Sequence, residues 1–408
     1  MNKFLKEFKD RGYFYQCTNE SELSILLNKE KIRGYIGFDC TAQSLHVGSL
    51  LQIMCLRLMQ KYGHRPIVLI GGGTTRIGDP SGKDKTRKIL NEKEIESNIK
   101  NIEKILKSFL NYNNPKTKPI FVNNYSWLKG LNYISFLRDI GKHFTINKML
   151  TFDSVKTRLE REQSLNYMEF NYMILQAYDF LELNKKKDCA LQIGGSDQWG
   201  NIINGVELIK RHLNKESFGL TTPLITLASG AKMGKTENGA VWLDKKLNSA
   251  YDYWQFWRNT DDKDVIKFLK FFTDLDVDKI DEIKDQDINS LKILLAKETT
   301  SMLHGKKAAL NAEQAAREAF SGNLLGSNIP SIKIENDLKG NFNIIDLIIL
   351  SKLETSKSEI KRLIKGNAIK INDEKISDEK LVIKKELFNK GYIKLSVGKK
   401  RHMRIDIN

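Results

Sequence analysis

Short runs of hydrophobic residues followed by glycine recur along the first half of the chain. Residues 32–36 (IRGYI) and 66–70 (PIVLI) have the continuous apolar pattern of buried strands, and 189–195 (CALQIGG) repeats it. Between the first two runs, residues 50–63 carry apolar side chains at helical spacing. This order predicts a βαβ unit, and therefore an α/β fold built on a parallel sheet. Ligands bind such sheets beyond the carboxyl ends of the strands, so the glycine-rich ends predict one common site.

The pattern changes several times in the later parts of the chain. Residues 88–165 are mostly helical in pattern and rich in lysine, which indicates an insertion between two halves of the sheet. Helical periodicity returns over 248–320, and a stretch rich in glycine and asparagine follows. We predict a sheet domain at 1–225 with a helical insertion at about 110–165, a helical domain at 226–320, a linker at 321–340 and a small domain at 341–408.

The small C-terminal domain contains a basic helix. Ser356 is expected to cap this helix and Gly366 to end it, and two short strands around Asn372 and Asp373 predict a hairpin. Residues 331–408 hold 18 Lys and Arg against 11 Asp and Glu. A solvated helix face is the simpler interpretation, but attachment to a nucleotide-type domain favours contacts to RNA phosphates. The expected RNA-binding side chains are Lys357, Lys361, Arg362 and Lys365.

Composition and charge support a polyanionic partner. The 408 residues carry 67 Lys and Arg against 50 Asp and Glu, a net charge of +17, which favours nucleic acid ahead of a membrane surface. A basic protein without such a partner is the alternative. The four cysteines show neither a CxxC pair nor zinc-like spacing, and no apolar run is long enough to span a bilayer. We therefore expect a cytoplasmic protein.

The stretch YIGFDCTAQSLHVGSL at 35–50 joins the first strand to the next helix. One interpretation is turn chemistry, in which Thr41 or Ser44 caps the helix. The other is a nucleotide phosphate at the helix N-terminus, where free N–H groups and the helix dipole favour negative charge. The sequence GGGTTRIG at 71–78 is not a dinucleotide fingerprint, and GDPSGKD at 78–84 lacks Walker A spacing, so a dinucleotide enzyme and a P-loop ATPase are disfavoured.

One predicted helix carries a polar stripe on an otherwise apolar surface. In NYMILQAYDFLEL at 171–183, Tyr172, Gln176 and Asp179 share one face. A solvated face would explain them. Because the flanking residues are apolar, however, a buried phenol, amide and carboxylate would need partners, which favours a small polar ligand.

Two glycine-rich loops carry cations. The sequence ASGAKMGKT at 228–236 has two lysines three residues apart, and the loop after 78 carries Asp79, Lys83 and Arg87. Each could be a surface loop. The functional interpretation of the first is a lid whose lysines close onto a triphosphate.

Together these segments resemble one family over nearly the whole chain, the bacterial-type tyrosyl-tRNA synthetases of class I. CTAQSLHVGS at 40–49 matches the HIGH signature of the class, and KMGKT at 232–236 matches its KMSKS loop. GGSDQWGN at 194–201 and YMILQAYD at 172–179 resemble the tyrosine-specific members, and 340–408 is similar to the S4-type RNA-binding domain. The resemblance implies a Rossmann-like catalytic domain with a helical insertion, a helical anticodon-side domain and an S4-like α+β domain.

The resemblance also implies roles for individual residues. The expected tyrosine-binding residues are Tyr35, Asp79, Tyr172, Gln176, Asp179 and Gln198. The expected ATP-binding residues are Gly37, Asp39, His46, Gly48, Gly195, Asp197 and Lys235. The expected catalytic residues around the phosphates are Thr41, His46, Ser49, Lys83, Arg87, Lys232, Lys235 and Thr236. Ser49 stands where the HIGH signature ends in histidine, and a serine donates a hydrogen bond but carries no charge.

The implied reaction is attack of the tyrosine carboxylate on the α-phosphorus of ATP, with release of pyrophosphate. The tyrosyl group then passes to the 3′-terminal adenosine of tRNA(Tyr). The first step needs no side-chain base because the carboxylate is already ionised, so positioning and cations should carry catalysis. Mg²⁺ would arrive with ATP, and no resident metal site is expected. The family resemblance further implies a homodimer with 110–165 as the interface.

Three other functions are alternatives to this interpretation. A tryptophanyl-tRNA synthetase shares the fold and the phosphate motifs, but it would not explain Tyr35 together with Asp179. A non-catalytic RNA-binding protein derived from a synthetase would suit the basic tail equally well. A nucleotidyltransferase acting on a small metabolite could use the HVGS segment, but it has no use for an RNA-binding tail.

Overall fold

The structure is a computed structural model of the chain. It describes residues 2–81, 90–228, 230, 233–236, 239–321, 331–334, 342–388, 391–398 and 401–407. Of residues 235–236 and 319–321 it describes the backbone alone. The chain divides into two compact units: the first holds 1–235, 240–244 and 263–285, and the second holds 236–239, 245–262 and 286–408.

The first unit is built on a six-stranded sheet. Its strand order is β1-β6-β5-β2-β3-β4, in which β1 is antiparallel to β6 and the other neighbours are parallel. The strands are β1 (Gln16–Cys17), β2 (Arg33–Asp39), β3 (Arg65–Gly71), β4 (Ile120–Asn123), β5 (Cys189–Gly195) and β6 (Phe218–Thr222). The predicted α/β fold and its parallel sheet are confirmed.

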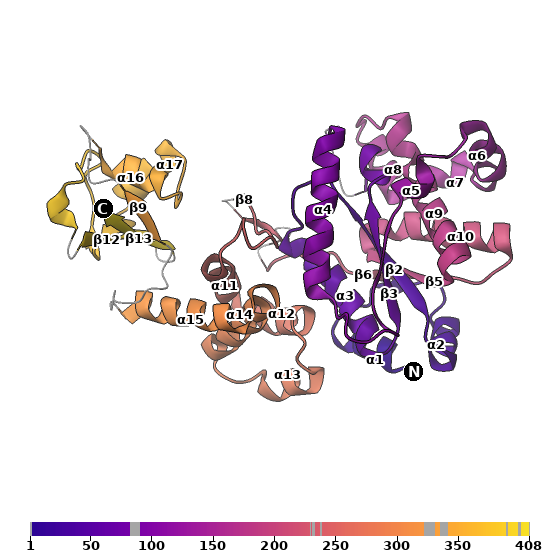
Figure 1. Cartoon of the computed structure of the whole chain (residues 1–408), viewed down its shortest axis with the longest axis horizontal. Coiled ribbons are helices and arrows are strands. Elements are labelled where there is room, and N and C mark those ends of the chain that lie inside the picture. Colours follow the sequence, from indigo (N-terminus) through magenta and orange to yellow (C-terminus); the bar gives the residue numbers. More distant parts are fainter. Residues whose placement is uncertain are drawn as a thin grey trace. The chain divides into compact units, whose positions relative to one another are not determined.

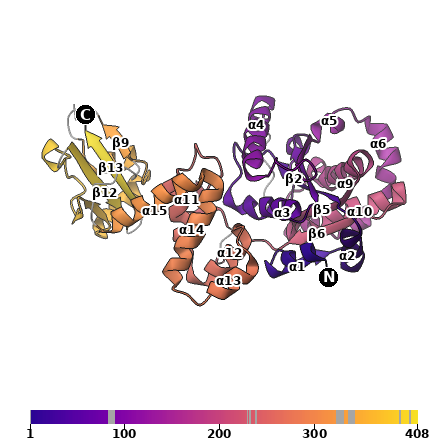
Figure 2. The same cartoon turned by 60° about the horizontal axis from the view of Figure 1, so that its bottom comes forward.

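Helices cover both faces of this sheet (Figures 1 and 2). Helices α3 (Leu50–Lys61) and α4 (Glu92–Phe109) lie on one face, and α9 (Tyr167–Lys187) and α10 (Trp199–Leu213) lie on the other. The chain therefore winds in opposite directions on the two sides of the β2–β5 pair. A crevice forms at the carboxyl ends of the strands where the direction reverses, and it is the expected ligand site of such a sheet.

The remaining helices of the first unit lie at its N-terminus, in the insertion and after residue 263. They are α1 (Lys3–Asp10), α2 (Glu20–Lys29), α5 (Tyr125–Leu128), α6 (Tyr133–Asp139), α7 (Ile146–Met149), α8 (Asp153–Glu160), α12 (Val265–Phe272) and α13 (Val277–Ile283). Short 3-10 turns occur at Val47–Ser49, Thr74–Arg76, Gly141–His143 and Ser196–Gln198.

Two predicted boundaries need correction in this unit. The insertion was expected from about residue 110, but 120–123 is strand β4, which pairs with β3, so the inserted helices begin only after it. The helical domain was expected over 226–320, but residues 263–285 belong to the first unit. Hydrophobic periodicity indicates that a helix is amphipathic, but it does not say which core receives its apolar face.

Among its described residues, the second unit contains three helices that follow the loop at 228–236 (the lysine-bearing loop), and it also contains the C-terminal domain. The helices are α11 (Ala250–Arg258), α14 (Ile288–His304) and α15 (Lys306–Ser321). A 3-10 turn at Asp262–Asp264 precedes α12, and β7 (Lys235–Thr236) pairs with β8 (Gly239–Ala240).

The C-terminal domain is a mixed sheet with two helices and an isoleucine-rich core of its own. Its strand order is β11-β10-β12-β13-β9. The strands are β9 (Ser331–Ile334), β10 (Ile369–Ile371), β11 (Glu374–Lys375), β12 (Tyr392–Val397) and β13 (Arg401–Ile407). The helices are α16 (Ile344–Leu350) and α17 (Lys357–Lys365), and a 3-10 turn lies at Lys385–Leu387.

Local predictions in the C-terminal domain were mostly right. The Ser356 side chain accepts a hydrogen bond from the Glu359 N–H, Gly366 ends α17, and Asn372 and Asp373 form the turn between β10 and β11. The linker at 321–340 was wrong in part, because 331–334 is strand β9 and pairs in parallel with β13. This strand is short, and the pairing that fixes it comes from residues about 70 positions later, which a local pattern does not reveal.

Within the described residues, none of the helices combines the length and apolar character needed to cross a membrane.

Candidate active site

A cavity of about 340 Å³ opens at the carboxyl ends of β2 and β5. It brings together residues that are far apart in sequence, as the strand topology predicts. Of the residues expected to bind tyrosine or ATP or to act in catalysis, those that line it are Tyr35, Gly37, Asp39, Gly48, Ser49, Asp79, Tyr172, Gln176, Asp179, Gly195, Asp197 and Gln198. The polar stripe on α9 therefore faces a cavity and not bulk solvent.

The deepest polar group on this stripe is the Asp179 carboxylate. It is 2% exposed, and it accepts hydrogen bonds from Asn124 Nδ2 at 2.9 Å and Trp127 Nε1 at 2.7 Å. Tyr35, which is 1% exposed, packs its ring against Phe180 with centroids 5.3 Å apart. Its hydroxyl has no hydrogen-bond partner among the described residues. A buried hydroxyl without a partner is unusual, so this end of the cavity is built to receive a polar group.

Burial controls the ionisation of Asp179. Removal from water raises the pKa of its carboxyl from 3.8 to about 7, and the Asn124 and Trp127 hydrogen bonds limit the rise. The pKa of the Tyr35 phenol is raised well above its ordinary value, first by burial and then by the Asp179 charge. Tyr35 therefore stays neutral, while Asp179 titrates near neutral pH.

A second carboxylate, the half-buried Asp39, lies at the end of β2. Its Oδ1 accepts a hydrogen bond from the Thr74 hydroxyl at 2.7 Å, and its Oδ2 accepts one from the Tyr172 hydroxyl at 2.9 Å. Asn124 Nδ2 also donates to Thr74 Oγ1, at 3.0 Å. A Cβ atom at Gly71 would lie 2.1 Å from Asp39 Oδ1, so only glycine leaves room for this carboxylate. Asp39 and Asp179 are thus joined through one hydrogen-bonded chain.

A further group of amides surrounds Asp79. Gln198 Nε2 donates to Asp79 Oδ2 at 2.8 Å, and the backbone N–H of Ser81 donates to Oδ1 at 2.9 Å. Asn201 Nδ2 donates to Gln176 Oε1 at 3.0 Å and to Gln198 Oε1 at 3.1 Å. Asn201 is 4% exposed and therefore fixes the direction of both amides. Together these groups present carboxylate and amide oxygens to the cavity, which suits a bound ammonium.

The signature segment at 40–49 lies beside the cavity, and its Gly48 and Ser49 line it. His46 caps the 3-10 turn that leads into α3, and its Nδ1 accepts a hydrogen bond from the Gly48 N–H at 3.0 Å. The expected caps, Thr41 and Ser44, do not fill this role, since the Ser44 hydroxyl donates to the Leu45 carbonyl instead. A Cβ at Gly234 would lie 2.6 Å from His46 Nδ1, so the backbone of the lysine-bearing loop lies against the histidine.

Not every expected residue joins the cavity. Thr41 is exposed and does not line it, because the segment after β2 turns its side chain to solvent. His46 lies beside it and contacts it through Gly48. Lys83, Arg87 and Lys232 lie outside the described residues, and of Lys235 and Thr236 only the backbone is described.

Sequence reasoning missed four supporting residues: Thr74, Asn124, Trp127 and Asn201. Each holds a cavity residue through a hydrogen bond between distant segments. Asn201 lay within GGSDQWGN, and Thr74 lay within GGGTTRIG, which was considered only as a dinucleotide fingerprint. For Asn124 and Trp127, the signal available was their place shortly after the end of β4.

Known proteins show the same arrangement of segments. The family model described as tRNA synthetases class I (W and Y) matches residues 27–321, and the model described as the tyrosine–tRNA ligase SYY-like C-terminal domain matches 323–405. The chain is 73% identical to the tyrosine–tRNA ligase of Pelagibacter ubique (strain HTCC1062) over 408 residues, 100% of both chains. The chain belongs to the class I tyrosine–tRNA ligases. The resemblance drawn from its motifs is confirmed.

Other tyrosine–tRNA ligases match over almost the same length. That of Wolbachia pipientis subsp. Culex pipiens (strain wPip) is 54% identical over 413 residues, covering 99% of this chain and 97% of the relative. Among solved structures, a C-terminally truncated mitochondrial tyrosyl-tRNA synthetase from Aspergillus nidulans is similar with a TM-score of 0.71 and 30% identity. That match covers 78% of this chain and 94% of the fungal one. These matches disfavour the tryptophanyl alternative.

If Asp179 binds the phenol of tyrosine, as expected from the sequence, its pKa should make tyrosine binding dependent on pH. If the phenol donates its hydrogen bond to the ionised carboxylate, protonation of Asp179 below pH 7 removes the acceptor. With a pKa of about 7 in the free protein, the apparent Kd for tyrosine should rise about tenfold from pH 8 to pH 6, in proportion to the lost ionised fraction. Equilibrium binding across this range measures the effect.

Two variants sharpen this pH test. Trp127→Phe removes a hydrogen bond that lowers the Asp179 pKa, so it should move the midpoint of the profile to higher pH. Asp179→Asn should bind tyrosine weakly with a flat profile over the same range. A pH profile that is the same in wild type and in Asp179→Asn would show that another group governs binding.

Proposed function

We propose that the cavity binds tyrosine with its phenol against Tyr35 and Asp179 and its ammonium against Asp79, Tyr172 and Gln176. The observation that carries this assignment is the buried Tyr35 hydroxyl, which lacks a partner among the described residues while a second phenol-binding group, Asp179, lies deep in the same cavity. A neutral hydroxyl and a carboxylate suit a phenol, which both accepts and donates.

The other end of the cavity is the proposed ATP site. Gly37, Gly48 and Gly195 let the nucleotide approach the backbone, and Asp39 and Asp197 supply carboxylates for hydroxyl or amine donors. His46 and the N-terminus of α3 face the phosphates, with Lys232 and Lys235 from the adjacent loop. In this arrangement the ionised tyrosine carboxylate attacks the α-phosphorus of ATP, and the cations stabilise the charge that develops on pyrophosphate.

The metal requirement belongs to this ATP site. We propose that Mg²⁺ arrives with the nucleotide, bound through its phosphate oxygens, as is usual for this ion. Among the described residues there is no group of three or more His, Cys, Asp or Glu side chains placed to hold a metal ion.

Amino-acid specificity follows from the need to pair buried groups. Phenylalanine would fill the same space but leave the Tyr35 hydroxyl and Asp179 desolvated without a phenol between them. Leaving buried polar groups unpaired costs about 1–3 kcal/mol each, and more for a charged group.

Amino-acid-dependent exchange between ATP and pyrophosphate tests the activation step. We expect exchange with tyrosine and none above background with phenylalanine or tryptophan, measured in parallel on the purified chain. Exchange with tryptophan would overturn the phenol pocket while keeping the fold. Absence of exchange with all three from folded protein would favour the RNA-binding alternative.

The basic face of α17 is a proposed RNA-binding surface. Lys357, Lys361, Arg362 and Lys365 are all exposed, while Ile360 and Ile364 on the opposite face are buried in the domain core. The pairs Lys361–Glu379, at 3.5 Å, and Arg362–Glu359, at 2.7 Å, are at the surface. Such exposed pairs contribute little and exchange readily for phosphate contacts.

Removing cations from α17 should weaken tRNA binding without affecting activation. We expect Arg362→Ala with Lys365→Ala to lower tRNA(Tyr) affinity and to flatten its dependence on salt, because fewer counterions are released. Tyrosine-dependent exchange should stay at the wild-type rate. Lys29→Ala, an exposed lysine at the end of α2, is the matched control. Equal loss of tRNA affinity in the control would contradict the assignment.

The insertion is a proposed dimer interface. Exposed apolar side chains gather on α6, α7, α8 and the start of α9: Tyr133, Ile134, Leu137, Ile146, Leu150, Leu159 and Tyr167. The most exposed of them, Ile134, is 70% exposed. A concentration of exposed apolar side chains in one segment is typical of an interaction site. We propose a second copy of this chain as the occupant, in line with the homodimer expected from the resemblance.

The oligomeric state tests this interface. Ile134→Asp together with Ile146→Asp should convert a dimer into a monomer, because each carboxylate would have to be desolvated on association. Sedimentation or light scattering gives the mass. Ile25→Asp changes an isoleucine that is 67% exposed on α2, outside the insertion, and should leave the dimer intact. An unchanged mass in the double variant would exclude this surface as the interface.

The state of the cysteines bears on the proposed compartment. Cys17, Cys40, Cys55 and Cys189 are all free. Burial raises the pKa of the Cys40 thiol to about 12 and that of Cys189 to about 12, so both stay protonated and unreactive. Free thiols of this kind suit a reducing compartment and support the proposed cytoplasmic location.

A further inference from the structure

The lysine-bearing loop is attached at its root to helix α12. Asp264, at the start of α12, is 4% exposed, and its Oδ2 accepts a hydrogen bond from the Ala228 N–H at 2.7 Å. Lys267, one turn later, pairs with Asp264 Oδ1 at 2.5 Å and donates to the Thr226 carbonyl at 3.3 Å. Two side chains of one helix turn therefore hold a backbone donor and a backbone acceptor on either side of Leu227.

The other end of α12 is held by the N-terminal segment. Arg11 is 3% exposed and donates to the carbonyls of Lys270 at 2.8 Å, Thr273 at 3.0 Å and Leu275 at 2.7 Å. These include carbonyls at the C-terminal end of the helix, which have no partner within it and attract a cation. Tyr13 adds a hydrogen bond to the Phe271 carbonyl at 2.8 Å.

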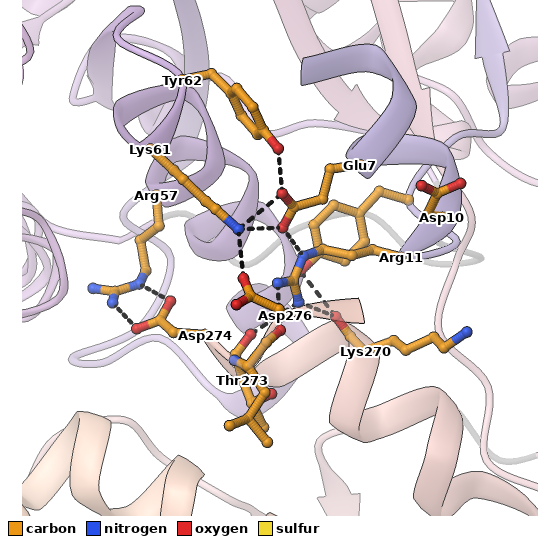
Figure 3. A network of polar contacts seen from close by, with 12 residues as sticks. Glu7, Asp10, Arg11, Arg57, Lys61, Tyr62, Lys270, Thr273, Asp274 and Asp276 are labelled. Carbon is orange, nitrogen blue, oxygen red and sulfur yellow. Dashed lines mark hydrogen bonds and ion pairs between the residues drawn. The ribbon is translucent and has the colours of Figure 1, made fainter. Parts of the chain in front are cut away.

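Arg11 is in turn fixed to helix α3 (Figure 3). Glu7 accepts from Arg11 Nε at 2.8 Å and from Lys61 Nζ at 2.9 Å, and the Tyr62 hydroxyl also donates to it. Lys61 also contacts Asp276, at 3.2 Å, just beyond α12. A cation and an anion in such a network each have more than one partner, which makes the geometry more rigid than a single pair would.

The same helix α3 begins at the signature segment. Its N-terminal end follows the 3-10 turn at Val47–Ser49, and near its C-terminal end Arg57 pairs with Asp274. The two parts of the site proposed to face the phosphates are thus joined twice: by the approach of Gly234 to the His46 ring and the Gly48 backbone, and by the path from α3 through α12 to the loop root.

We infer that Asp264, supported by Lys267, is a positioning residue for the activation step. It fixes the start of the lysine-bearing loop against α12 and through it positions the loop's lysines for the phosphates; this inference rests on the proposed phosphate role of those lysines. It makes no contact with the cavity that is proposed to bind tyrosine. Loss of the contacts from Asp264 and Lys267 to the start of the loop should therefore lower the rate of the ATP step and leave tyrosine binding unchanged.

The test compares exchange rate with tyrosine affinity. We expect Asp264→Ala to lower kcat for tyrosine-dependent ATP–pyrophosphate exchange about tenfold or more, since small misplacements of catalytic groups have effects of this size. The Kd for tyrosine should stay at the wild-type value. Asp264→Asn keeps an oxygen for the Ala228 N–H but loses the ion pair, so it should fall between Asp264→Ala and wild type.

A matched control comes from the same helix. Lys270 pairs with Asp281 at 2.8 Å, away from the loop root, so Asp281→Ala removes an ion pair of α12 without touching the loop and should leave kcat unchanged. Folded Asp264→Ala with the wild-type kcat would overturn the inference. An equal loss of tyrosine affinity would also overturn it, because the residue would then act on the whole unit.

Two further variants keep the outcome decisive. If Asp264→Ala does not fold, Lys267→Met removes the Thr226 contact from a more exposed position, and a wild-type kcat there would overturn the inference. Lys235→Ala tests the proposed phosphate role separately. If it leaves kcat unchanged, the proposed function of the loop fails; if it lowers kcat while Asp264→Ala does not, only the positioning role fails.

Discussion

The buried Asp179 carboxylate at the carboxyl end of a parallel sheet must be given hydrogen-bond donors, and this requirement organises the first unit. Asp179 and Asp39 are joined through Asn124 and Thr74, which come from the two loops that follow β4 and β3. A buried charge left without such partners would be strongly destabilising. The loops are therefore held in place by the same groups that shape the cavity, and the sheet, the insertion and the cavity form one cooperative arrangement.

The two ends of the cavity are built on different principles. At the proposed amino-acid end, side chains hold side chains, and a buried amide such as Asn201 fixes their direction. At the proposed phosphate end, backbone lies against backbone, as where Gly234 lies beside Gly48, and Asp264 at the start of α12 holds the root of the loop. Fixed side chains suit selection of one amino acid. A loop held by its root suits a segment whose cations must meet a transferring phosphate.

Sequence alone predicted the parts that depend on local pattern. The strands of β2, β3 and β5, the helix of α17 and the stripe of Tyr172, Gln176 and Asp179 all follow from periodicity and caps. It failed where a distant segment decides the outcome. Strand β9 exists because β13 pairs with it, and α12 joins the first unit because α1 and α3 receive it. Asn124 and Trp127 were missed because their neighbours in sequence do not reveal that the Asp179 carboxylate lies within hydrogen-bond distance.

The hydrogen bonds of Asn124 constrain how the amino-acid specificity of this protein could change. Its amide nitrogen donates to both Thr74 and Asp179, so both of its N–H groups are used, and its oxygen accepts the Gly73 N–H at 2.7 Å. Replacing Asp179 alone by an apolar residue would leave the Asn124 and Trp127 donors without this acceptor. Single substitutions toward another side chain are therefore strongly epistatic. Evolution or engineering of an altered substrate range must exchange the carboxylate and its donors together.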